Sequence, residues 1–161
     1  MSPTPNSFAG AECYKGSDIN GAQFYVALPG KWNNSYESLV IYAPGGPGPT
    51  SAGSHSIEAD ALAGLFGSFL PHRVAVAVTA YSRQGWAVGT NAQDIDNLRV
   101  LFTRNFGRPA HTILFGSSYA GGVVAKALER YADDLDGTPN YDGALVHSGI
   151  MAGVANYFGY W

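Results

Sequence analysis

Four short runs of apolar residues constrain the fold of this chain more than any other feature. Each run is uninterrupted and rich in β-branched or small residues, which is typical of strands covered on both faces of a sheet. The runs are Leu39–Ala43, Val74–Val78, Thr112–Phe115 and Ala144–Val146. A further run, Gln23–Leu28, ends at a Pro-Gly pair and is also predicted to be a strand.

Amphipathic patterns separate several of these runs. Three sets of apolar residues repeat with the i, i+3, i+4, i+7 spacing of one helix face. They are Ile57, Ala61, Leu62, Leu65, Phe66 and Phe69; Ile95, Leu98, Leu101, Phe102 and Phe106; and Val123, Val124, Ala127, Leu128 and Tyr131. Because strands that alternate with helices join by right-handed crossovers, the sequence predicts an α/β fold. We expect a doubly wound, mostly parallel sheet with flanking helices.

The chain contains no internal repeat and no linker that would divide it, so residues 1–161 are predicted to form a single, partial α/β core domain. Residues 1–20 are polar and turn-rich and are interpreted as an irregular lead-in. Four of the last five residues are aromatic. We therefore interpret residues 150–161 as the start of a cap or of a further helix, and the fold as truncated before the cap and the last strands.

Charge and composition exclude several classes of protein. The net charge is −3 and no basic run is present, so nucleic acid is not an expected partner. The single cysteine, Cys13, excludes an internal disulfide and a thiolate metal cluster. No apolar stretch has the length of a membrane helix, and no signal peptide is present. We expect a soluble chain without cofactor or metal, either cytoplasmic or secreted with its signal removed.

The turn after the run that ends at Phe115 carries the residue most suited to chemistry. A serine on a sharp strand-to-helix turn exposes its hydroxyl above the sheet, and the residues two before and two after it must be small. Ser118 meets this condition, because Gly116 and Ala120 flank it. Ser117 does not, since Phe115 lies two residues before it. The sequence therefore favours Ser118 as a nucleophile.

Two backbone N–H groups are candidates for an oxyanion hole. The Tyr119 N–H lies at a predicted helix N-terminus, where free N–H groups carry partial positive charge. A second donor is expected from the glycine-rich loop at residues 43–49. The prolines of this loop cannot donate, which leaves Gly45 and Gly46, and we favour Gly46.

Together, the loop Pro44–Gly48 and the turn Gly116–Gly121 resemble the α/β-hydrolase superfamily, namely the N-terminal portion of its serine esterase and proline iminopeptidase-like branch. The loop is similar to the His-Gly-Gly-Pro-Gly loop of proline iminopeptidase-like members, with Pro44 in place of the histidine. The segment from Tyr81 to Asp94 resembles bacterial esterases and peptidases. The resemblance spans about residues 20 to 155.

This resemblance implies a serine hydrolase that cleaves carboxylic esters through an acyl-enzyme at Ser118, with Tyr119 and Gly46 or Gly45 as oxyanion donors. The substrate would be a small-molecule ester or a peptide. Two alternatives stay open: a serine aminopeptidase, and a non-catalytic hydrolase-fold fragment or binding module. A nucleotide-binding domain is a weaker alternative, because no G-x-G-x-x-G fingerprint or P-loop lysine follows a predicted strand.

The catalytic acid and base of such enzymes follow the serine in the order Ser, Asp or Glu, His. His147 is the only histidine after Ser118, and a strand-end histidine is a better interpretation of it than a base. The resemblance therefore implies that this chain alone is inactive or weak, unless a homo-oligomer or a complementing C-terminal chain supplies the missing residues. Apolar surface at the sheet edge is predicted to promote association.

The remaining candidate side chains have structural interpretations. His72 and His111 precede predicted strands, at the edge of the sheet away from catalysis. His55 follows the glycine-rich loop and is expected to be solvated. The acidic residues near the third helical pattern are interpreted as a solvated turn: Asp133, Asp134, Asp136 and Asp142. Trp32 and Trp86 either line a substrate pocket or pack in the interior.

Overall fold

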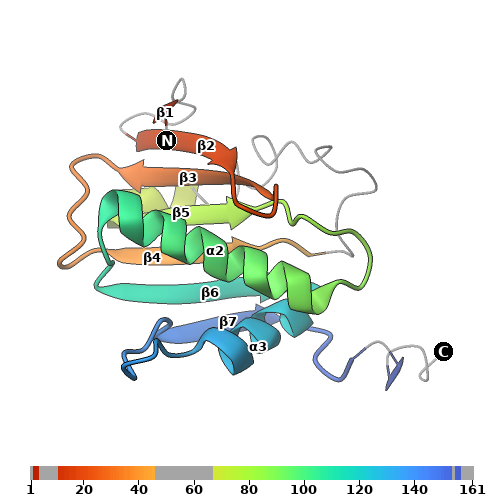
Figure 1. Ribbon diagram of the computed structural model, residues 1–161. Coiled ribbons are helices and arrows are strands. Elements are labelled where there is room, and N and C mark those ends of the chain that lie inside the picture. The colour runs from red at the N-terminus through yellow and green to blue at the C-terminus, as the bar shows by residue number, and fades with distance from the viewer. Residues whose placement is uncertain (1, 4–10, 46–66, 154, 157–161) are drawn as a thin grey trace.

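A seven-stranded mixed sheet organises the chain in a computed structural model, which describes residues 2–3, 11–45, 67–153 and 155–156 (Figure 1). The strands are β1 (Ser2–Pro3), β2 (Ala11–Ser17), β3 (Gln23–Pro29), β4 (Ser38–Ala43), β5 (Val74–Thr79), β6 (His111–Ser117) and β7 (Gly143–His147). All five strands expected from the apolar runs are therefore confirmed.

The order of the strands across the sheet is β1-β2-β3-β5-β4-β6-β7. Strands β5, β4, β6 and β7 form a parallel block, whereas β1, β2 and β3 pair in antiparallel fashion and β3 joins the block antiparallel to β5. The register pairs Ala43 with Gly116 and Ser117 with His147. The carboxyl ends of β4, β6 and β7 consequently meet at one edge of the sheet.

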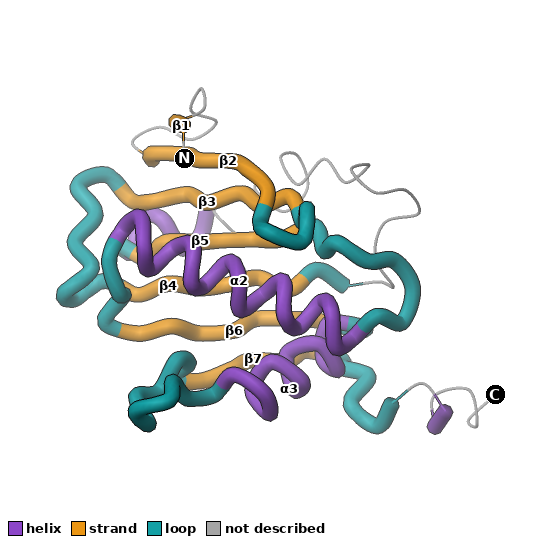
Figure 2. The backbone as a smooth tube through the Cα atoms, in the orientation of Figure 1, coloured by secondary structure: helices purple, strands orange, loops and turns teal. Residues whose placement is uncertain are grey.

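Two long helices, α2 (Val88–Phe106) and α3 (Ala120–Tyr131), lie side by side on one face of the sheet (Figure 2). The short elements α1 (Gly67–Phe69) and η2 (Leu70–His72) cover part of the opposite face, where Phe69 and Leu70 pack against the cluster that contains Val76 and Val78. Most of the helical pattern expected over Ile57–Phe69 lies outside the described residues. No helix in the described ranges is both long enough and apolar enough to cross a bilayer.

The predicted faces of the second and third helical patterns are confirmed by their burial. Three apolar residues of α2 and three of α3 are at most 1 % exposed: Ile95, Leu98, Phe102, Val123, Val124 and Ala127. They pack with β-strand residues in one large cluster, while a second cluster fills the other face of the sheet. Burial on both faces explains why β3, β4 and β5 are continuously apolar. The expectation fails for the run Ala144–Val146, because β7 is the outer strand and most of its residues are exposed.

The prediction of an irregular lead-in over residues 1–20 is wrong for Ala11–Ser17, which form β2 and pair along their whole length with β3. Ala11 and Cys13 are buried and the intervening Glu12 is exposed. This alternation is short and contains residues with low β-propensity, so sequence alone gives a weak strand signal. Pairing with the strongly apolar β3 decides the conformation.

Candidate active site

Ser118 occupies the turn between the end of β6 at Ser117 and the start of α3 at Ala120. Its φ is +53°, a left-handed conformation that is uncommon for residues other than glycine, and its side chain is exposed. The Ser118 N–H donates to the carbonyl of His147 at 3.1 Å, and the Ser118 carbonyl accepts from the N–H groups of Gly121 and Ile150, each at 3.0 Å. These three hydrogen bonds hold the strained turn between α3 and the segment after β7.

Small residues flank this turn, as the sequence argument requires. A Cβ atom on Gly116 would lie 3.0 Å from Ala120 Cβ, 3.0 Å from Val124 Cγ2 and 3.3 Å from the Ala120 carbonyl oxygen. The strand and the helix approach each other so closely at Gly116 that a Cβ atom there would force the neighbouring atoms to shift. The tight geometry assumed for position 118 is therefore present.

The glycine-rich loop after β4 reaches the same turn. A Cβ atom on Gly45 would lie 3.1 Å from the Ser117 carbonyl oxygen, 3.2 Å from Ser117 Oγ and 3.7 Å from Ser118 Cβ. The structure thus brings Gly45 beside Ser118. Gly46, which the sequence favours, and His55 lie outside the described residues.

Tyr119 connects the turn to the interior. Its side chain is 2 % exposed, and its hydroxyl accepts a hydrogen bond from Asn91 Nδ2 at 2.9 Å. Burial raises the pKa of Tyr119 above its usual value, and the bond from Asn91 only partly offsets this. Among the described residues, no carbonyl accepts from the Tyr119 backbone N–H. This N–H lies at the positive end of α3.

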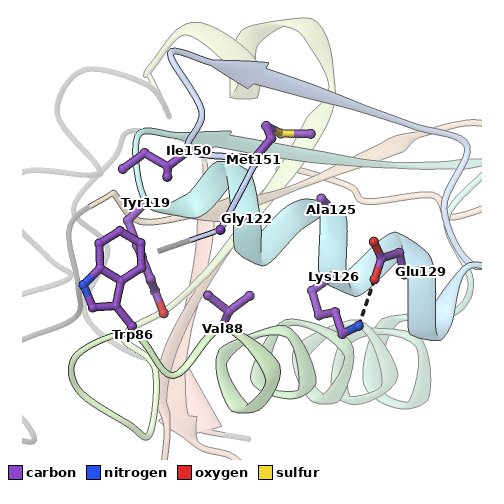
Figure 3. A pocket seen from close by; sticks show the side chains of 10 residues that line it. Trp86, Val88, Tyr119, Gly122, Ala125, Lys126, Glu129, Ile150 and Met151 are labelled. Carbon is purple, nitrogen blue, oxygen red and sulfur yellow. Dashed lines mark hydrogen bonds and ion pairs between the residues drawn. The ribbon is translucent and has the colours of Figure 1, made fainter. Parts of the chain in front are cut away.

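A recess of about 220 Å³ opens beside Tyr119. Figure 3 shows Trp86 against Tyr119 on one side and Ile150 and Met151 on the other, with a Lys126–Glu129 ion pair of 2.8 Å farther along α3. Trp86 and Tyr119 meet edge to face, with ring centroids 5.3 Å apart. We call this space the Trp86 recess.

The two tryptophans left open by the sequence have different surroundings. Trp86 lines the recess and is 37 % exposed. Trp32 instead packs edge to face on Phe102 at 5.5 Å and donates from Nε1 to the Phe106 carbonyl at 3.0 Å. Trp32 is thus part of the packing between the β3–β4 connection and α2, whereas Trp86 contacts Tyr119 and lines the recess along α3.

The two histidines before predicted strands lie where the sequence places them, and Asp133, Asp134 and Asp136 are exposed in the turn after α3. The interpretation as a solvated turn is wrong for Asp142, because its carboxylate accepts a hydrogen bond from the Thr112 N–H at 2.7 Å. His72 ends η2 just before β5, and His111 begins β6, where its Nδ1 lies 3.3 Å from Asp142 Oδ1. The four acidic residues named above are all exposed. In the described ranges no group of three or more His, Cys, Asp or Glu side chains is arranged to hold a metal ion.

His147 contacts the turn through its backbone rather than through its ring. Its carbonyl accepts the Ser118 N–H, and its side chain is exposed. In the part of the chain that the structure describes, no imidazole and no carboxylate is hydrogen-bonded to the Ser118 hydroxyl.

Sequence reasoning missed the polar contacts of the segment after β5. Asp94 of α2 is 0 % exposed, and its carboxylate accepts from the Ser82 N–H at 2.7 Å, from Ser82 Oγ at 2.8 Å and from Asn20 Nδ2 at 3.0 Å. Tyr81, next to Ser82, donates from its hydroxyl to the Pro44 carbonyl at 3.1 Å. A charged residue beside the apolar face of α2 is a sequence signal for a buried contact, but its partners are distant in the chain.

No protein-family model and no curated protein sequence matches the chain. Its fold, however, matches solved structures of hydrolases. An S-formylglutathione hydrolase from Agrobacterium tumefaciens gives a TM-score of 0.63 at 13% identity, over 93% of this chain and 62% of the other. Esterase B from Lactobacillus rhamnosis gives 0.56 at 17% identity, over 86% of this chain and 48% of the other.

A post-proline cleaving enzyme from Rickettsia typhi gives a TM-score of 0.59 at 11% identity, over 87% of this chain and 21% of the other. The chain therefore spans at most 62% of the length of these three structures. Between 86% and 93% of it superposes on these hydrolases of esterase and peptidase type. The chain has the α/β-hydrolase fold.

Proposed function

We propose that the protein is a serine hydrolase that cleaves carboxylic ester bonds through an acyl-enzyme at Ser118. The observation that carries the proposal is the exposed hydroxyl of a left-handed residue between β6 and α3. A serine that is strained, exposed and held by three backbone hydrogen bonds is difficult to explain by packing alone. The similarity to solved esterases supports the same reaction class.

The chemistry follows from the groups around the turn. Ser118 Oγ attacks the carbonyl carbon of the ester, a C–O bond forms, and the carbonyl electron pair moves to oxygen. The Tyr119 N–H and a second N–H, from Gly45 or Gly46, donate to this oxyanion. Collapse of the intermediate expels the alcohol, which takes the serine proton. Attack by water on the acyl-enzyme then releases the acid and restores the hydroxyl.

The Trp86 recess supports a small substrate. Its volume of about 220 Å³ and its walls of Trp86, Tyr119, Ile150 and Met151 suit a short apolar acyl or alcohol group. Esters of short-chain acids are therefore the first substrates to test. A serine peptidase is the second candidate, because the fold also matches a post-proline cleaving enzyme.

The base that activates Ser118 belongs to the proposal as well. Removal of triad members costs several powers of ten in rate, so a serine without a base turns over slowly. Since no described imidazole or carboxylate is bonded to the Ser118 hydroxyl, we propose that residues outside the described set or a second chain supply the base. We expect only weak turnover from this chain alone.

Association of the chain remains a prediction. Leu145 on the outer strand β7 is 62% exposed and Met151 is 59% exposed. Exposed apolar side chains at an open sheet edge promote pairing with another chain. Light scattering at increasing concentration checks this, and a constant monomer mass would contradict it.

Labelling by a fluorophosphonate tests the function directly. We expect a covalent adduct on the peptide that contains Ser118, measured by mass spectrometry, and weak hydrolysis of p-nitrophenyl butyrate. Ser118→Ala should abolish both, whereas Ser117→Ala, the matched control, should retain both. A labelling rate no higher than that of the urea-unfolded chain would instead favour the non-catalytic alternative.

A further inference from the structure

Tyr81 lies at the carboxyl edge of the sheet, two residues after β5 ends at Thr79. It is 5 % exposed, and its φ is +50°, the same left-handed conformation as Ser118. Its N–H donates to Thr79 Oγ1 at 3.3 Å. A bulky aromatic residue rarely adopts this conformation, so its surroundings must hold it there.

The Tyr81 hydroxyl crosses from β5 to the loop after β4, where it donates to the Pro44 carbonyl oxygen at 3.1 Å. Burial, and to a lesser extent the neighbouring Tyr119, Tyr42 and Asp94, raise the pKa of Tyr81 well above its usual value. The hydroxyl therefore keeps its proton at all ordinary pH values and acts as a permanent donor.

The Pro44 carbonyl and the Gly45 N–H belong to one peptide group. This group is planar and trans, so its C=O and N–H point in opposite directions. A hydrogen bond that fixes the carbonyl consequently also fixes the direction of the N–H. It also polarises the amide, which makes the N–H a stronger donor.

The Gly45 peptide lies beside the Ser118 turn, as shown by the 3.7 Å between a Cβ built on Gly45 and Ser118 Cβ. The Tyr81 ring is itself supported by Tyr119, edge to face at 6.3 Å, and Tyr119 is held by Asn91 of α2. One pair of tyrosines thus connects the two backbone segments that carry the candidate oxyanion donors.

We infer that Tyr81 is a positioning residue, which aims the Gly45 N–H at the oxyanion by holding the Pro44 carbonyl. This inference rests on the proposed function, and it selects Gly45 rather than Gly46 as the second donor. It adds Tyr81 to the site as a residue that acts through the backbone and does not touch the substrate.

Tyr81→Phe in the full chain tests the inference. Phenylalanine keeps the ring and its contact with Tyr119, and it removes only the hydroxyl. The matched control is Tyr141→Phe, which removes another buried tyrosine hydroxyl, one that donates to Asp96 Oδ1 at 3.1 Å. Melting curves establish that both variants are folded.

We expect Tyr81→Phe to slow phosphonylation of Ser118 by about tenfold, which is less than the loss of a direct oxyanion donor causes. In ester hydrolysis kcat should fall by the same factor, while KM changes by less than about twofold. Tyr141→Phe should label at the rate of the unchanged protein. Equal labelling rates for the unchanged protein and Tyr81→Phe would overturn the inference.

Hydrogen exchange of the Gly45 amide separates this inference from the proposed function. If Tyr81 holds the loop, the amide should exchange several times faster in Tyr81→Phe than in Tyr141→Phe, whether or not Ser118 reacts. Absence of labelling in the unchanged protein, together with this faster exchange, would reject the hydrolase, and with it the oxyanion role, and would leave only the finding that the Tyr81 hydroxyl orders the Gly45 peptide. Unchanged exchange would reject the positioning role itself.

Discussion

Gly116 and Ala120 meet across the turn that carries Ser118: a Cβ on Gly116 would lie 3.0 Å from Ala120 Cβ. Gly116→Ala should therefore lower the free energy of unfolding by about 1–3 kcal/mol, because β6 and α3 must separate to make room. It should also slow labelling of Ser118. Chemical denaturation measures the first effect. Gly143→Ala on β7, where the added Cβ has its nearest contact at 3.6 Å, is the control and should change stability little.

The left-handed backbone of Ser118 predicts an unusual order of stability among its variants. At φ +53° alanine is strained and glycine is not, so Ser118→Gly should be more stable than Ser118→Ala by about 1 kcal/mol. Urea unfolding of both variants measures the difference. At Ser117, in strand β6, the order should reverse, because glycine weakens a strand. Equal stabilities at position 118 would show that the turn relaxes without the serine.

Gly45→Ala tests the approach of the glycine-rich loop to the turn. The added methyl group would lie 3.1 Å from the Ser117 carbonyl oxygen and 3.2 Å from Ser117 Oγ, so the loop must move by a few tenths of an ångström. Because catalysis is sensitive to small displacements, labelling of Ser118 should slow by about tenfold or more. Gly67→Ala, where the added carbon would have no described atom within 4 Å, should label normally. A normal rate for Gly45→Ala would exclude this loop from the site.

Asp142 lies at the amino edge of the sheet, and it makes the free energy of unfolding of the protein depend on pH. Burial raises the pKa of its carboxyl group, but the hydrogen bond from the Thr112 N–H at 2.7 Å and the neighbouring His111 outweigh this and lower it below the usual value. A carboxyl group with a lower pKa in the folded protein stabilises the fold at pH values above its pKa in the unfolded chain, about 3.9. This stabilisation is lost as the pH falls through the pKa of the folded protein.

Asp142→Asn should therefore destabilise the protein at pH 7, by about 0.5–1 kcal/mol because the carboxylate is partly exposed. The difference from the unchanged protein should shrink as pH falls below about 4. Urea unfolding at pH 7 and pH 3 measures both values. Asp133→Asn, an exposed aspartate in the turn after α3, is the control and should be neutral at both pH values. A difference that persists at pH 3 would assign the effect to packing.

The strands and helices of the core could be predicted because their signals are local. Continuous apolar runs predict strands buried on both faces, and the spacing of Ile95, Leu98 and Phe102 predicts one buried face of α2. Strand β2 could not be predicted from the same criteria. Its residues become a strand because β3 offers unpaired backbone groups beside them, which is a property of the assembled sheet.

The α/β architecture, the turn at Ser118 and the need for small residues at Gly116 and Ala120 could be predicted from the amino-acid sequence, because each depends on residues close together in the chain. Three further features became visible in the folded chain alone: β3 runs antiparallel to β5, Gly45 lies beside Ser118, and the Tyr81 hydroxyl reaches the Pro44 carbonyl. These contacts join segments separated by tens of residues. Such contacts form only when strands that are distant in the sequence pair side by side. The residue pattern of a single segment does not predict the order of the strands in the sheet.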